Sequence, residues 1–122
     1  MRRTLPLVLL LAACSAAPPA SSATFDLDEY EIHSSADTFS SGHIVLEVDN
    51  EGEFPHTLVV TRSDGSVVQA IDPLAPGSDE SLALDLPPGS YQVSCRIVVQ
   101  LPNGSIVDHF QHGMYMQIKV VG

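Results

Sequence analysis

Apolar residues alternate with polar ones along much of the chain, and this spacing constrains the fold more than any other feature. The stretch from Tyr91 to Val99 has an apolar residue at every second position. In a β-strand such residues share one face, whereas a helix needs a period near 3.6. No stretch of residues 24–122 keeps the helical period, and proline or glycine interrupts the chain at short intervals. The pattern predicts an all-β domain built from two sheets.

Several further strands are predicted from the same alternation. A first strand region contains Phe25, Leu27, Tyr30 and Ile32, and a later strand runs from Ser81 to Leu86. Three other sets are each expected to share one strand face: Ile44, Leu46 and Val48; His56, Leu58 and Val60; and Met114, Met116, Ile118 and Val120. Side chains alternate across a strand. Cys95, Met114 and His56 therefore fall on the same faces as apolar neighbours and are expected to point inward.

The N-terminus predicts export from the cytoplasm. Arg2 and Arg3 precede an apolar run, residues 5–13, that is too short to span a bilayer as a mature helix. The run ends in Leu-Ala-Ala and then Cys14, which fits a bacterial lipobox. We expect residues 1–13 to be a lipoprotein signal peptide and Cys14 to carry the lipid. The alternative is ordinary signal cleavage with a cysteine nearby by chance.

The rest of the chain divides into a spacer and one domain. Residues 14–23 consist mostly of small residues and proline, which cannot bury enough surface to fold, so we expect a flexible tether. Residues 24–122 suffice for one modest hydrophobic core. The expected location is extracytoplasmic, on the periplasmic side or the cell surface, with the lipid as the only membrane attachment.

The charge of the chain limits its partners. Without Arg2 and Arg3, three basic residues remain against fifteen acidic ones, a formal charge of −12. Such a surface repels nucleic acid and anionic lipid, so neither is expected as a partner. It would instead steer basic partners or attract cations. The simpler interpretation is that the acidic residues only maintain solubility.

Cys95 has no disulfide partner if the lipid consumes Cys14. A lone thiol in an oxidising compartment is open to oxidation unless something protects it, and a metal would do so. Four other residues could bind a metal, and all are expected where strands meet loops: His56, His109, His112 and Met114. Each of them, taken alone, could equally be an ordinary core or loop residue. Two histidines, a cysteine and a weak methionine form the blue-copper ligand set. No signature of a Cys-His hydrolase accompanies them.

Three segments resemble the cupredoxin family. Residues 50–58, NEGEFPHTL, are similar to the N-x-G-x-x-P-H-x-L segment that supplies the first histidine ligand. Residues 88–95, PGSYQVSC, are similar to the G-x-Y-x-x-x-C strand that delivers the thiolate. Residues 109–114, HFQHGM, are similar to H-x-x-x-G-M, with the second histidine and the methionine. The resemblance covers nearly the whole expected domain.

The resemblance implies a Greek-key β-sandwich with one mononuclear type 1 copper ion, held by His56, Cys95, His109 and Met114. It also implies an electron carrier without enzymatic activity, which acts as a monomer and meets a redox partner protein through a basic docking patch on that partner. Zinc accepts the same nitrogen and sulfur donors. Two other functions stay open: a copper carrier or chaperone with exchangeable metal, and a metal-free binding or structural domain.

One departure from the family pattern lies between the second and third segments. Thirteen residues separate Cys95 from His109, where the family has only a few. Asn103-Gly104 between apolar β-branched stretches predicts a hairpin, which would return His109 close to Cys95. The insert could instead alter or abolish the site. His112 is the alternative second histidine ligand.

Overall fold

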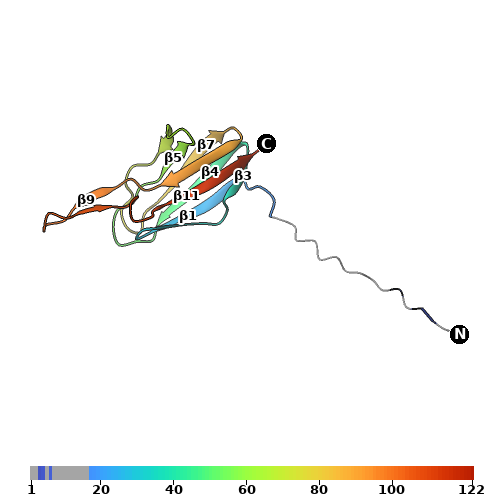
Figure 1. Ribbon diagram of the computed structural model, residues 1–122, viewed down its shortest axis with the longest axis horizontal. Coiled ribbons are helices and arrows are strands. Elements are labelled where there is room, and N and C mark those ends of the chain that lie inside the picture. Colours follow the sequence, from blue (N-terminus) through green and yellow to red (C-terminus); the bar gives the residue numbers. More distant parts are fainter. Residues whose placement is uncertain (1–2, 5, 7–16) are drawn as a thin grey trace.

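Two β-sheets pack face to face and enclose the core (Figure 1). The computed structural model describes residues 3–4, 6 and 17–122. One sheet has the strand order β2-β1-β4-β7, with bounds Glu31–Ser34, Ser22–Asp28, Gly42–Asn50 and Asp79–Leu86. The other has the order β3-β11-β8-β5-β6, with bounds Thr38–Ser40, Tyr115–Val121, Gly89–Ser94, Val59–Arg62 and Val67–Ala70.

Both sheets are mixed, because β1 runs parallel to β4 and β3 runs parallel to β11, while the other pairs are antiparallel. The all-β prediction is confirmed. Within the described ranges, no helix is long and apolar enough to cross a membrane.

The core follows the predicted alternation. Ile44, Leu46 and Val48 of β4 are fully buried, and the residues between them reach the surface to different degrees. Tyr91 and Val93 of β8, in the opposite sheet, are also buried in the core. Burying one such side chain contributes about 1.5–3 kcal/mol. These strands therefore form a firm support for the loops at their ends.

The first strand begins earlier than the sequence suggested. β1 starts at Ser22, Ala20 bridges to Phe39, and Ala23 is buried. The end of the expected spacer therefore belongs to the sheet, because pairing with β4 satisfies its backbone. Cys14 lies outside the described residues, as does nearly all of the expected signal peptide.

The predicted first strand region is two strands instead of one. A turn at Glu29 and Tyr30 separates β1 from β2, which pair as an antiparallel hairpin with Asp28 opposite Glu31. The step of three residues from Leu27 to Tyr30 breaks the period of two and explains the turn. Tyr30 is therefore a turn residue, and its assignment to a strand was wrong.

The thirteen-residue insert forms the predicted hairpin. Its strands are β9, Val98–Gln100, and β10, Ile106–Asp108. Gly104 closes the turn with a φ of 86°, a conformation that glycine adopts without strain. The hairpin extends from the end of the sandwich away from the C-terminus (Figure 1). Because its two strands pair, the chain returns beside β8, where it left.

Candidate metal centre

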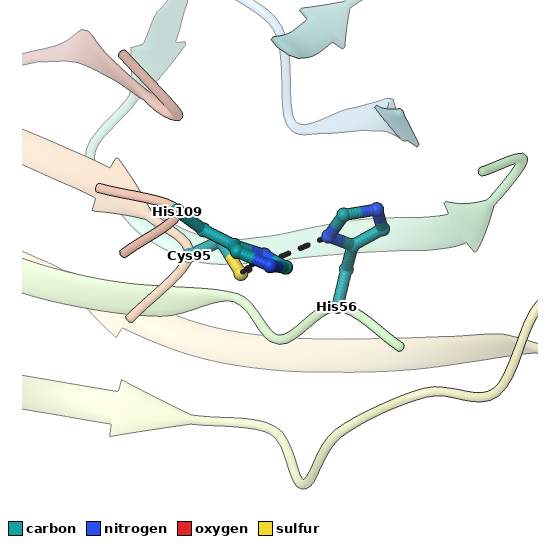
Figure 2. A group of neighbouring side chains, drawn as sticks. All are labelled: His56, Cys95 and His109. Carbon is teal, nitrogen blue, oxygen red and sulfur yellow. Dashed lines mark hydrogen bonds between the residues drawn. The ribbon is translucent and has the colours of Figure 1, made fainter. Parts of the chain in front are cut away.

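Three separate segments bring the predicted ligands to one end of the sandwich. His56 lies in the loop between β4 and β5, Cys95 follows β8, and His109 follows β10 at the base of the hairpin. Met114 directly precedes β11. Since β8 lies between β5 and β11 in one sheet, the chain near their ends is close in space. Figure 2 shows the side chains of His56, Cys95 and His109 turned toward one another.

The two imidazoles present the same nitrogen to the sulfur. Cys95 Sγ lies 3.5 Å from His109 Nδ1 and 3.9 Å from His56 Nδ1. The possible ligand atoms of these three residues all lie within 4.8 Å of one another. The centroids of the two imidazole rings are 5.1 Å apart. The three side chains thus enclose a small volume that each can reach with one donor atom.

Backbone hydrogen bonds hold the three segments in place. The N–H of Cys95 donates to the carbonyl of Met114 at 3.0 Å, and the N–H of Met114 donates to that of His109 at 3.1 Å. His56 and Leu74 exchange two backbone bonds, of 3.2 and 2.7 Å. The N–H of Thr57 points at Cys95 Sγ from 3.4 Å. This last contact places a donor on the sulfur, as expected for a group that orients a thiolate ligand.

The cluster is closed to solvent. Cys95 and His56 have no exposed surface, and His109 is 2% exposed. Burial raises the pKa of the Cys95 thiol and outweighs the N–H groups of Thr57 and Ile97, which lower it. Burial also lowers the pKa of His109, and the neighbouring His56 lowers it further. Without a metal, the site therefore favours a neutral thiol beside a neutral His109 ring.

The remaining two candidates have different places. Met114 is fully buried. Its backbone forms hydrogen bonds with the backbones of two members of the cluster, Cys95 and His109. His112 is not among the three clustered residues; its ring stacks on Tyr30, with centroids 4.6 Å apart. This arrangement favours His109 over His112 as the second histidine ligand. Metal ligation by any of these residues remains a prediction.

Glu29 is a further residue at the site that the sequence did not indicate. Its Oε1 lies 3.2 Å from His56 Nε2, the ring nitrogen that faces away from the sulfur. Nothing in the residues around Glu29 marks it among fifteen acidic residues, and it lies 27 residues before His56 in the chain. Only the turn between β1 and β2 brings the two together.

The donor set fits a copper ion. Proteins hold metals such as zinc with nitrogen at about 2.0–2.1 Å and sulfur at about 2.3 Å, so atoms 3.5 and 3.9 Å apart can share one ion. Imidazole suits both copper and zinc, and a thiolate favours Cu(I) and zinc over hard cations. A cysteine with two histidines is also the equatorial set of blue-copper sites. The buried donor atoms thus match the equatorial ligands of a type 1 site.

Comparison with known proteins bears on the fold. The structure superposes on auracyanin from the photosynthetic bacterium Roseiflexus castenholzii, in its dithionite-reduced form, with a TM-score of 0.64 and 17% sequence identity. The match covers 86% of this chain and all of auracyanin. A purple cupredoxin from Nitrosopumilus maritimus matches with a TM-score of 0.45 and 16% identity, over 79% of this chain and 77% of that one.

The sequence matches no protein-family model and no curated protein. The superposition on auracyanin nevertheless spans nearly the whole described domain. The cupredoxin-like β-sandwich expected from the three sequence segments is confirmed.

Proposed function

We propose that this cupredoxin-fold protein binds one copper ion and carries single electrons outside the cytoplasm. One observation carries the proposal: the Nδ1 atoms of two histidines and the sulfur of an unpaired cysteine converge in a closed cluster. His56, Cys95 and His109 would hold the ion, and Met114 would be a weak fourth ligand. When bound, copper supplies a centre that gains and loses one electron.

The residues of the chain would keep that centre rigid. Imidazole suits both oxidation states of copper, whereas thiolate and thioether favour Cu(I), so the mixed set supports both states. The bonds between Cys95, Met114 and His109 limit movement of the ligands when the charge changes. A carrier or chaperone needs an ion that partners can reach and remove. The complete burial of His56 and Cys95 therefore favours a retained ion over an exchangeable one.

An apolar groove beside His109 is the suggested route for the electron. It has a volume of about 280 Å³ and is lined mainly by apolar and aromatic side chains of the hairpin and of the loops around it: Tyr30, Phe54, Pro55, Ile97, Val99, Leu101, Val107 and His109. His109 is the only member of the cluster that lines the groove. A redox partner with a basic patch would approach there, steered by the net negative charge of the protein.

The location belongs to the same proposal. The lipobox-like segment that ends at Cys14 supports attachment to a bacterial membrane by lipid. The described chain enters the sandwich at Ala20, which bridges to Phe39 and lies near the C-terminal strand. The hairpin lies at the other end (Figure 1), and the metal centre is at its base, because His109 directly follows β10. A tether that ends before Ala20 would thus leave the metal centre facing away from the membrane.

Spectroscopy of the protein with added Cu(II) tests the proposal. We expect an intense visible band from charge transfer between the Cys95 thiolate and copper, together with one copper ion per chain by mass spectrometry. Cys95→Ser and His109→Ala should lose the band. His112→Ala is the matched control and should keep it, because His112 is outside the cluster.

Two results would contradict the proposal. Protein purified from its native host without metal, and unable to take up Cu(II) or Cu(I), would be a metal-free binding domain. Loss of the band in His112→Ala but not in His109→Ala would give His112 the role of ligand. Copper that leaves the protein during each redox cycle would instead indicate a carrier.

A further inference from the structure

The turn between β1 and β2 places one carboxylate against the back of the metal centre. Glu29 Oε1 accepts hydrogen bonds from the N–H of Glu53 at 2.7 Å and of Phe54 at 2.8 Å. The same oxygen lies 3.2 Å from His56 Nε2. Three nitrogens from the loop that carries His56 therefore surround a single oxygen atom. The side chain of Glu29 is 22% exposed, so water only partly screens these contacts.

The loop is shaped to admit this carboxylate. A Cβ atom on Gly52 would lie 2.5 Å from Glu29 Oε1, closer than real Cβ contacts. A side chain at position 52 would therefore displace the Glu29 carboxylate from this position. The N–H groups of Glu53 and Phe54 both donate to this carboxylate, and such hydrogen bonds favour its charged form. The carboxylate is charged at neutral pH.

The geometry determines which nitrogen of His56 carries the proton. Glu29 Oε1 already accepts two N–H bonds, so it is an acceptor toward the ring as well. Nε2 must therefore be the donor. In the neutral imidazole the other nitrogen, Nδ1, then has a free lone pair, and Nδ1 is the atom that faces Cys95 Sγ. A carboxylate that accepts from a ligand histidine also raises the basicity of that ligand.

We propose that Glu29 is a positioning residue of the metal centre, which keeps Nδ1 of His56 free for the ion and, through its negative charge, favours Cu(II) over Cu(I). The effect of Glu29 on the His56 tautomer concerns the metal-free protein. The effect of its charge on the copper oxidation states rests on the proposed function. The carboxylate does not touch the ligand atoms around the ion; it acts through the His56 ring. Its charge lies on the far side of that ring, where it stabilises the more positive oxidation state.

Two substitutions test the charge effect and the tautomer effect separately. Glu29→Gln keeps an acceptor oxygen for Glu53 and Phe54 but removes the charge. We expect it to lose roughly tenfold in Cu(II) affinity with little change for Cu(I), which raises the reduction potential by about 59 mV. Glu29→Ala removes the acceptor altogether. In metal-free protein, nitrogen NMR of His56 should then show a mixture of tautomers in place of the single Nε2–H form.

A matched control lies on the same hairpin. Glu31 also pairs with a histidine, at 2.9 Å from His33 Nε2, but both side chains are about two-thirds exposed. Glu31→Gln should leave the reduction potential and the His56 tautomer unchanged. A wild-type potential in Glu29→Gln would overturn the charge effect, because a residue that only clamped the loop would give that result. A single Nε2–H form in Glu29→Ala would overturn the tautomer effect.

The failure of this inference differs from failure of the proposed function. Wild-type protein that takes up no copper would remove the proposed function and the charge effect with it. The tautomer measurement needs no metal and would still decide whether Glu29 positions His56. If wild-type protein turns blue but both Glu29 variants keep the wild-type reduction potential and His56 tautomer, the copper site is supported and the role of Glu29 is refuted.

Discussion

Cys95 is a free cysteine whose surroundings would protect it in the oxidising compartment that we propose for this protein. Its side chain has no exposed surface. Thiols react mainly as exposed thiolates, and burial in apolar surroundings makes them inert. The raised pKa of Cys95 keeps the metal-free site in the neutral, unreactive form. A metal ligand must be the thiolate, so metal uptake has to release the proton.

We expect the apparent Cu(II) affinity to rise about tenfold per pH unit between about pH 7 and 8. The raised pKa of Cys95 means that the thiol is protonated throughout this interval and gives up one proton on binding. The lowered pKa of His109 means that its ring is already neutral and releases none. Competition with a chelator of known affinity at several pH values measures the slope.

Calorimetry in buffers of different protonation enthalpy provides a direct count of the protons released. One proton per Cu(II) is expected for wild type near pH 7.5, and the Cys95→Ser variant should not show it. An affinity independent of pH would mean that the thiol is ionised in the metal-free protein, contrary to the effect of its burial.

The sequence predicted the inward orientation of Cys95 but not the contact between Glu29 and His56, and the difference has a physical reason. The alternation from Tyr91 to Val99 predicted that Cys95 faces inward, because strand parity is a local property. The contact between Glu29 and His56 joins a turn in one hairpin to a loop 27 residues later. Such a contact depends on how two strands align in space. A sequence pattern does not encode that alignment when the residue belongs to a common type.

At the scale of elements, the loop between β4 and β5 is held together by one buried amide. The side chain of Asn50, 2% exposed, donates to the carbonyls of Phe54 and Leu74 at 2.9 Å each. Its oxygen accepts the N–H of Gly52 at 2.9 Å. The amide thus fixes both the loop that carries His56 and the segment that bonds the His56 backbone.

Asn50→Ala should lower the free energy of unfolding by about 2–3 kcal/mol, since it removes the three hydrogen bonds that this buried side chain makes. For a domain of this size that is roughly 10–20 °C in melting temperature. Urea unfolding of metal-free protein measures the change. Asn103→Ala is the control: Asn103 also bonds its own turn but is exposed, so it should lose less than about 1 kcal/mol. Equal losses would refute the role of Asn50.

The hairpin insert was predictable because its signal is local. Asn103-Gly104 between β-branched residues marks a tight turn, and Gly104 has the positive φ that such turns need. The pairing of the main strands was not predictable in this way. The parallel contacts of β1 with β4 and of β3 with β11 join segments that no turn connects. The three residues of β3 are too few for a periodic pattern.

At the scale of the whole molecule, apolar and acidic surface are distributed differently. The hairpin from Val98 to Val107 has no charged residue and exposes Val98 and Ile106 by more than half. The expected mature chain has a formal charge of −12. An uncharged hairpin tip beyond the metal centre, on a protein with a strongly negative net charge, would let long-range attraction guide a basic partner while contact at the hairpin stays largely apolar.

Long-range attraction of this kind predicts opposite salt effects for reagents of opposite charge. The rate of electron exchange between copper-loaded protein and a cationic outer-sphere complex should fall at least about tenfold between roughly 0.01 and 0.15 M ionic strength, because the screening length shrinks from about 30 to about 8 Å. The rate with an anionic complex should rise over the same range. Stopped-flow absorbance at the copper band measures both. Equal salt dependence for the two complexes would mean that the metal centre does not sense the acidic surface, which would then serve solubility alone.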